Sequence, residues 1–132
     1  MNLPLYAPIG FWDKKAKGKM DEDCNGCGSE LDISGKLVPD TIYGLNIRDA
    51  CCCPHDYMYK YGLTRVDKIF ADVMFLYNMI ATILNYGGWL TMPRIFRATK
   101  YFVAVVQFGD ESFSFEKEVM NENRITFQGS FI

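Results

Sequence analysis

The sequence predicts a mainly α fold: two long antiparallel helices, an irregular N-terminal loop, a third helix and a small C-terminal β-hairpin. Three observations support this prediction. Apolar residues recur at helical spacing from residue 66 to residue 84, glycines at 62 and 87–88 can end helices, and residues 112–128 alternate apolar with polar side chains. A chain of 132 residues is long enough for one core but not two, so we expect a single domain over residues 1–132.

The first element is a loop, and the first long helix follows it. Residues 1–45 hold most of the Pro and Gly, together with a run of charged residues, which predicts irregular structure. Asn46 or Asp49 can cap a helix that ends before Gly62. Pro54 lies inside this segment and has no N–H to donate, so the helix must begin late or kink there.

The second and third helices have recognisable ends. Thr64 can cap a helix that runs to the Tyr-Gly-Gly stretch at 86–88, and Thr91 with Pro93 in the first turn can open a helix that runs to Gly109. Beyond it, residues 112–119 and 124–128 alternate around the turn-forming residues 121–123. This pattern predicts the C-terminal hairpin.

Composition and local charge restrict the partners. A net charge of −2 gives no support to a nucleic-acid partner. Phe11 and Trp12 stand beside the lysines of residues 14–19, which is either a rim that contacts an anionic phospholipid membrane or a solvated basic loop.

The start of the chain has no secretory signal pattern, and the longest apolar run, Val73–Leu84, is shorter than the roughly 20 residues that cross a bilayer. The default expectation is a cytoplasmic protein without a transmembrane helix that is delivered to a membrane surface.

The single histidine limits the chemistry. His55 alone cannot build a multi-histidine metal site, and there is no G-x-S-x-G nucleophile motif. If the chain is an enzyme, His55 is the natural general base, and the neighbouring Asp56 can bind a hard cation. A second carboxylate should hold the other imidazole nitrogen, and the second helix offers Asp67 and Asp72 for this role.

The stretch DACCCPHDYMY (residues 49–59) resembles the active-site helix of the phospholipase A2 superfamily. The family pattern C-C-x-x-H-D-x-x-Y is matched by Cys51, Cys52, His55, Asp56 and Tyr59. Farther on, TRVDKIFADVM resembles the R-[IL]-D-x-x-F segment of the microbial members. A small group of bacterial and phage proteins shares the same two motifs.

This resemblance implies calcium-dependent hydrolysis of phospholipid esters at a membrane surface. His55 would activate water, Asp67 would orient the imidazole, and Tyr59 would help to hold that carboxylate. The implied calcium ligands are Asp56, Asp23 and the backbone around Gly26 and Gly28. Geometry offers Asp72 as an alternative to Asp67, because in a tight helical hairpin Asp72, 8 residues after Thr64, lies level with His55, 7 before Gly62.

The five cysteines support a second class of function. Cys24 and Cys27 with two of Cys51–Cys53, such as Cys51 and Cys52, could enclose a structural zinc ion, to which His55 could contribute. The chain would then be a non-catalytic, zinc-stapled interaction protein of phage or bacterial origin on the same scaffold. Disulfides from Cys24 and Cys27 into the Cys51–Cys53 cluster are the alternative, and they would leave one thiol free. Either staple is compatible with a hydrolase site.

Overall fold

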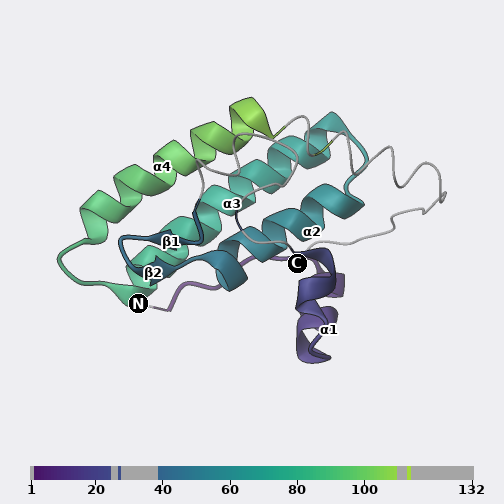
Figure 1. The fold of residues 1–132 in the computed structure, drawn as a ribbon, viewed down its shortest axis with the longest axis horizontal. Helices are drawn as coiled ribbons and strands as arrows, with labels where there is room; N and C mark the ends of the chain where they lie inside the picture. The colour runs from purple at the N-terminus through teal and green to yellow at the C-terminus, as the bar shows by residue number, and fades with distance from the viewer. Residues whose placement is uncertain (1, 25–26, 28–38, 110–112, 114–132) are drawn as a thin grey trace.

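The computed structural model describes residues 2–24, 27, 39–109 and 113 (Figure 1). In chain order, the elements are α1 (Ile9–Ala16), the 3₁₀ turn η1 (Met20–Asp23), strands β1 (Thr41–Ile42) and β2 (Leu45–Asn46), the π-helical turn η3 (Arg48–Cys52), α2 (Cys53–Tyr61), α3 (Arg65–Tyr86) and α4 (Thr91–Phe108). The predicted mainly α fold is confirmed.

Helix α3 lies in the middle of a layer, with α2 on one side and α4 on the other (Figure 1). Helix α1 projects from this layer on the side of α2. The main core lies where α3 meets α4 and η3, around Ile47, Phe75, Met79 and Tyr101. Helices α2 and α3 therefore form the expected antiparallel pair, joined by the short connection at residues 62–64.

The observed hairpin differs in place from the predicted one. Strands β1 and β2 pair antiparallel, with Thr41 opposite Asn46 and Ile42 opposite Leu45. Tyr43 and Gly44 form the turn, and both have positive φ (46° and 82°), as a tight two-residue connection requires. The hairpin predicted for residues 112–128 lies outside the described residues except Phe113, whose N–H donates to the Gly109 carbonyl.

A π-helical turn precedes Pro54, which has no N–H to donate within a helix. The Ile47 carbonyl accepts from the N–H groups of both Cys51 (2.9 Å) and Cys52 (3.1 Å), so the backbone widens before α2 begins at Cys53. Pro54 then occupies the first turn of α2, where its missing N–H leaves no helical hydrogen bond broken. The late start predicted from Pro54 is confirmed.

The ends of α3 follow their sequence signals. The Thr64 side chain accepts from the Asp67 N–H, and the Asp67 carboxylate accepts from the Thr64 N–H, which makes a complete capping box. At the other end, Gly87 has φ 72°, a conformation that strongly favours glycine, and the helix stops. Helix α4 begins at Thr91 itself, with Leu90 rather than Thr91 at the capping position.

Among the described residues, α3 is the one helix long and apolar enough to cross a membrane by length and composition. The signal is weak, because the core helix of a globular domain passes the same test. Helix α3 also buries Lys68, Asp72 and Asn78. Asn78 accepts from the Tyr6 N–H and donates to the Tyr6 carbonyl, each at 2.8 Å, so this polar group ties the N-terminal segment to the helix.

Candidate active site

A buried histidine and aspartate face each other between α2 and α3. His55 Nε2 lies 2.8 Å from Asp72 Oδ1, and the two side chains are 8% and 3% exposed. The pairing follows from the helical hairpin, because the two residues are almost equally far from the connection at 62–64. The carboxylate fixes the orientation of the imidazole and, by accepting at Nε2, favours the tautomer in which Nδ1 is free of a proton.

Two further side chains donate to the same carboxylate. The Tyr59 hydroxyl donates to Asp72 Oδ1 at 2.6 Å, and the buried Lys68 ammonium donates to Oδ2 at 2.7 Å and to the Val105 carbonyl at 3.4 Å. Lys68 thus links the site to α4. We define the polar network as His55, Tyr59, Lys68 and Asp72. Every member lies on α2 or α3, so rigid helices hold the whole arrangement.

The network keeps Asp72 ionised. Burial raises the pKa of this carboxyl, but the hydrogen bonds and charges of His55, Lys68 and Tyr59 outweigh burial and lower the pKa below its usual value. Asp72 is therefore a carboxylate at neutral pH, in a place where an unpaired charge would be costly.

The packing around the polar network restricts the position of the Tyr59 side chain. A Cβ atom added at Gly109 would lie 2.3 Å from the Tyr59 hydroxyl oxygen, so only glycine fits at the end of α4. The His55 ring packs between the rings of Tyr59 and Phe75, with centroid distances of 4.1 and 4.8 Å. These contacts fix both rings of the site.

The second nitrogen of His55 faces outward. In the described part of the chain, Nδ1 has no hydrogen-bond partner, and no fully buried side-chain nitrogen or oxygen there lacks one. It follows that Nδ1 keeps contact with solvent. A neutral imidazole with one nitrogen held by a carboxylate and the other in reach of water is the arrangement of a general base.

The structure corrects the expected partner of His55. Asp67, which the family motif favoured, accepts from the N–H groups of Leu63 (2.8 Å) and Thr64 (3.0 Å) at the start of α3. Its role there is to cap the helix. Asp72, the alternative that helical rise indicated, makes the contact with His55. Tyr59 is adjacent to His55 as expected, but the carboxylate it holds is that of Asp72.

The predicted calcium ligands do not come together among the described residues. Asp56 follows His55 on α2 and is half-buried. Asp23 is instead an ion-pair partner of Lys14 and Lys60, with a side chain 3% exposed. Burial raises the pKa of Asp23, but these two ammonium groups outweigh it and lower the pKa, so the carboxylate is already neutralised by protein charges. Gly26 and Gly28 lie outside the described residues.

Within the described residues, no group of three or more His, Cys, Asp or Glu side chains could hold a metal ion. Asp56 alone does not satisfy a calcium ion, which takes 6–8 oxygen ligands.

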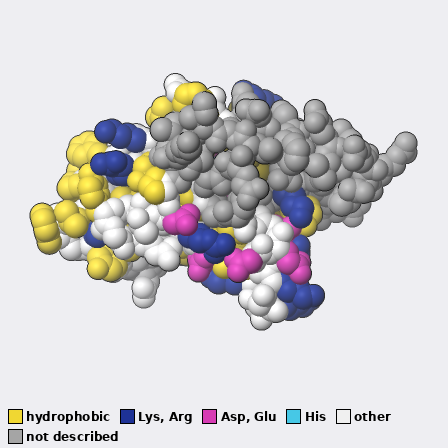
Figure 2. Space-filling model, in the orientation of Figure 1, with side chains coloured by type: hydrophobic (Ala, Val, Ile, Leu, Met, Phe, Trp, Pro, Cys, Tyr) yellow, Lys and Arg dark blue, Asp and Glu magenta, His cyan; other side chains and the backbone are white. Residues whose placement is uncertain are grey.

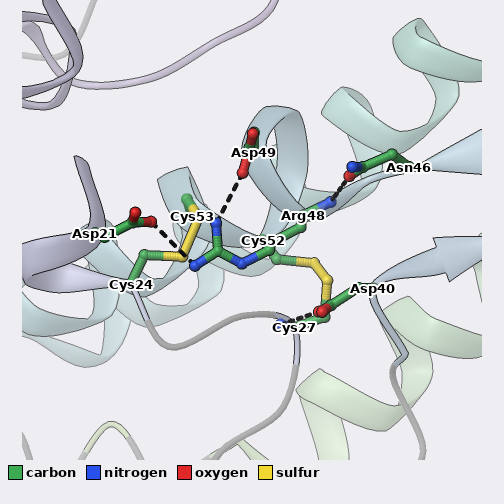
Figure 3. Close-up of polar contacts among 9 residues, drawn as sticks. All are labelled: Asp21, Cys24, Cys27, Asp40, Asn46, Arg48, Asp49, Cys52 and Cys53. Carbon is green, nitrogen blue, oxygen red and sulfur yellow. Dashed lines mark hydrogen bonds and ion pairs between the residues drawn. A yellow bond between two sulfur atoms is a disulfide. The ribbon is translucent and has the colours of Figure 1, made fainter. Parts of the chain in front are cut away.

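Two disulfides join the N-terminal loop to the start of α2. Cys24 pairs with Cys53 and Cys27 with Cys52, as in the disulfide alternative (Figure 3). Beside them, the Arg48 guanidinium donates to Asp21 at 3.0 Å and to Asp49 at 2.8 Å. The four paired sulfurs are not the thiolates that zinc needs, so zinc binding stays a prediction for the reduced chain.

The fifth cysteine is an unreactive core residue. Cys51 is buried, with its sulfur 3.6 Å from the Thr82 hydroxyl. Burial raises the pKa of its thiol to about 12. A thiol that stays protonated is a poor nucleophile, so Cys51 does not suit the role of a catalytic cysteine.

The basic segment near the N-terminus differs from the expected membrane rim. Phe11 is 2% exposed and packs against Tyr57, so it belongs to a small core around α1. Lys14 is held by Asp23, and the Trp12 indole donates to the Ala7 carbonyl at 3.1 Å. Phe11 could enter a lipid layer only by leaving this core.

Comparison of the chain with protein families, curated proteins and solved structures gives no match. The fold and the site thus define the class of molecule by themselves: a mainly helical domain, stapled by two disulfides, with a buried carboxylate-bound histidine. Disulfides form and persist in oxidising compartments, which favours such an environment over the expected cytoplasm.

Proposed function

We propose that the chain is an ester hydrolase of the phospholipase A2 type, in which His55 activates water. The observation that carries the proposal is the 2.8 Å contact between His55 Nε2 and the buried Asp72 carboxylate. A histidine on a helix needs no such partner for folding, since burying the pair costs solvation that an apolar pair would not lose. The sequence motif around His55 and Tyr59 supports the same choice.

Each member of the polar network has a defined part in the proposed reaction. His55 Nδ1 accepts a proton from water as the water oxygen attacks the ester carbonyl carbon. The resulting imidazolium is stabilised by Asp72, and His55 then gives the proton to the leaving alcohol oxygen as the C–O bond breaks. Tyr59 and Lys68 keep Asp72 ionised and in place. No covalent intermediate is needed.

Calcium stays the proposed cofactor. Asp56 is the carboxylate next to the base, and with loop oxygens it would hold an ion that polarises the ester carbonyl. Because the described residues do not complete the ligand set of a calcium ion, the calcium dependence of the reaction is measured separately from the role of His55.

An apolar groove of a size that suits a fatty acyl chain lies on the other side of α3. At 100° per residue, its α3 lining residues fall about 140–200° around the helix from Asp72. The groove has a volume of about 500 Å³ and is lined by Pro4, Leu5, Tyr6, Phe70, Met74 and Tyr77. This volume is within the usual range for small-molecule sites. Tyr6, Phe70 and Met74 also pack on the cluster that contains Tyr59. The link that these contacts give between the groove and the polar network is the packing around Tyr59.

The test is fatty acid release from vesicles of phosphatidylcholine and phosphatidylglycerol, with calcium and with chelator. We expect the intact chain to release fatty acid with calcium, and His55→Ala to release none. Asp72→Asn should lose at least about 100-fold in rate, because the 10²–10⁴-fold contribution of His55 as general base depends on the carboxylate that fixes its tautomer and stabilises its charged form.

Asp67→Asn is the matched control for Asp72→Asn. It makes the same chemical change on the same helix, and it should keep the rate within a few-fold because Asp67 acts as a cap. No release by a folded chain under any condition, or equal rates for the two Asn variants, would leave the polar network a structural feature. The chain would then be a disulfide-stapled, non-catalytic interaction protein.

A further inference from the structure

We propose that the outer face of α4, together with the turn that precedes it, is a docking surface for an anionic lipid membrane. The docking surface consists of Tyr86, Trp89, Met92, Phe96, Val103 and Val106, with Lys100 at its edge. The proposal rests on the proposed function for its biological purpose, but lipid binding itself requires no hydrolysis. It replaces the segment around Phe11 as the part of the chain that meets lipid.

Helix α4 is apolar on two opposite faces. Arg94, Ala98, Tyr101 and Val105 form its buried face. Met92, Phe96, Val103 and Val106 fall within a sector of about 80° on the other side, at 100° per residue, and Thr99 is the one polar residue within that sector. These four side chains are 42–65% exposed. A helix of a globular protein normally turns a polar face outward, so the second apolar stripe indicates a non-aqueous partner.

The turn between α3 and α4 adds two large aromatic side chains. Trp89 is 89% exposed and Tyr86 is 67% exposed. Tryptophan and tyrosine favour the boundary between water and lipid, because their rings are apolar and carry one polar group. In water, exposure of the large apolar surface of Trp89 gives no stabilisation.

Charge identifies the partner as an anionic surface. Between Asp72 and Asp110 the chain has three basic residues and no acidic residue. Arg94 is buried against backbone carbonyls and Arg97 donates to the Tyr43 hydroxyl, so Lys100 is the cation at the edge of the stripe. In Figure 2, hydrophobic side chains and Lys or Arg side chains gather at the left end of the molecule, where Figure 1 shows the turn from α3 to α4, whereas the acidic side chains lie elsewhere. An apolar face with basic residues and no acid beside it is typical of helices that lie in the interface of anionic membranes.

In this orientation helix α4 lies between the lipid and the site. The apolar stripe runs along α4 from Met92 to Val106, so the helix would lie parallel to the lipid surface rather than touch it with one end. The far end of α4 is close to the polar network, because the Val105 carbonyl accepts from Lys68. The docking surface would therefore hold the site one helix diameter, roughly 10 Å, from the lipid.

The test uses the intrinsic fluorescence of Trp89. The chain has two tryptophans, so Trp12→Phe leaves Trp89 as the only reporter. On titration with vesicles of equal parts phosphatidylcholine and phosphatidylglycerol, we expect a blue shift of the emission and quenching by brominated acyl chains. Neutral phosphatidylcholine vesicles should give weaker binding. The same shift in the Trp12→Phe, His55→Ala variant would show that docking does not depend on catalysis.

Variants of the docking surface have a matched control. Met92→Ser with Phe96→Ser should weaken partitioning at least about tenfold, from the apolar area that no longer enters lipid. Lys100→Gln should weaken binding to anionic vesicles about fivefold and leave binding to neutral vesicles unchanged. Ile9→Ser with Leu63→Ser removes two side chains of similar exposure from other elements, and it should change nothing.

Three results would overturn the proposal. The first is an emission of Trp89 that neither vesicle shifts. The second is equal loss of binding in the control and in the Met92, Phe96 variant. The third is a concentration-dependent dimer that the Met92, Phe96 variant abolishes and vesicles do not disrupt, since the surface would then be an interface between two copies of the chain. A docked but inactive chain would instead contradict the proposed hydrolase and leave the docking surface intact.

Discussion

Replacing Lys68 with methionine tests whether the polar network is held by charge. The Lys68 side chain is 2% exposed, and its ammonium lies 2.7 Å from Asp72 Oδ2. Methionine keeps the length and apolar stem but removes the cation, so the Asp72 carboxylate keeps only His55 and Tyr59 as donors. Removing one partner of a buried ion pair costs about 3–5 kcal/mol. With two donors left, we expect about 3 kcal/mol.

The assay is urea unfolding at neutral pH with the disulfides intact. At a slope of about 2 kcal/mol per M, a loss of about 3 kcal/mol lowers the midpoint by about 1.5 M. Lys100→Met is the control, because Lys100 is exposed on α4 and its replacement should cost no more than about 0.5 kcal/mol. A Lys68→Met variant that loses less than about 1 kcal/mol, at an unchanged slope, would refute the reasoning.

The cost of Lys68→Met should also depend on pH. The pKa of Asp72 is lowered in the folded chain, so its ionised form stabilises the fold above the usual carboxyl pKa, and this contribution is lost as acid lowers the pH through the folded value. Once Asp72 is protonated, Lys68 has no anionic partner in the parent chain either. The difference between parent and variant should therefore shrink below about pH 4. A difference that stays constant down to pH 2 would show that Asp72 is not the partner that matters.

Three further predictions concern single side chains near the site. Gly109→Ala should displace the Tyr59 hydroxyl from Asp72, and both the urea midpoint and the rate of fatty acid release should fall, whereas Gly88→Ala should leave that rate unchanged. Thr64→Ala should lower the unfolding free energy by about 1 kcal/mol without changing the rate, because it removes only a cap. Cys51 should resist iodoacetamide at pH 8 in the folded chain and react once urea unfolds it, as mass spectrometry would show.

Local signals were sufficient to predict α2, α3 and α4, but not α1, which lies within residues 1–45 where irregular structure was predicted. Thr64 and Gly87 bound α3 because a threonine hydroxyl can cap the first turn and a glycine can adopt positive φ after the last one. Pro54 likewise predicted the late start of α2. Each of these effects depends only on residues within one turn, which a single sequence contains. The hairpin at 41–46 was missed because strands of two residues are too short to show alternation.

The polar network depended on tertiary structure and was predicted only in part. His55 and Tyr59 follow from spacing on one helix, but the choice between Asp67 and Asp72 needed the register of α2 against α3. The family motif favoured Asp67, and the helical rise favoured Asp72. Lys68 was not anticipated, although its spacing of four residues before Asp72 was a usable signal for an ion pair on one helix face.

Long-range partners were the least predictable. Asp23 was expected to bind calcium, but Lys14 and Lys60 approach it from α1 and α2. The local sequence does not show whether a carboxylate will bind a metal ion or will instead be paired with lysines from distant parts of the chain. The pairing of Cys24 with Cys53 was open for the same reason, since spacing alone does not select among connectivities.

The order of the two disulfides makes the segment between them dispensable for covalent integrity. Cys27 and Cys52 pair inside the loop closed by Cys24 and Cys53, so two nested covalent links bound the segment from residue 28 to residue 51. A protease that cuts once between these points would leave two fragments still joined, and His55 would remain anchored beside Cys53. The covalent attachment of α2 to the N-terminal segment would thus survive such a cut, although Ile42, Ile47 and Cys51 within residues 28–51 belong to the main core and hold it by packing as well.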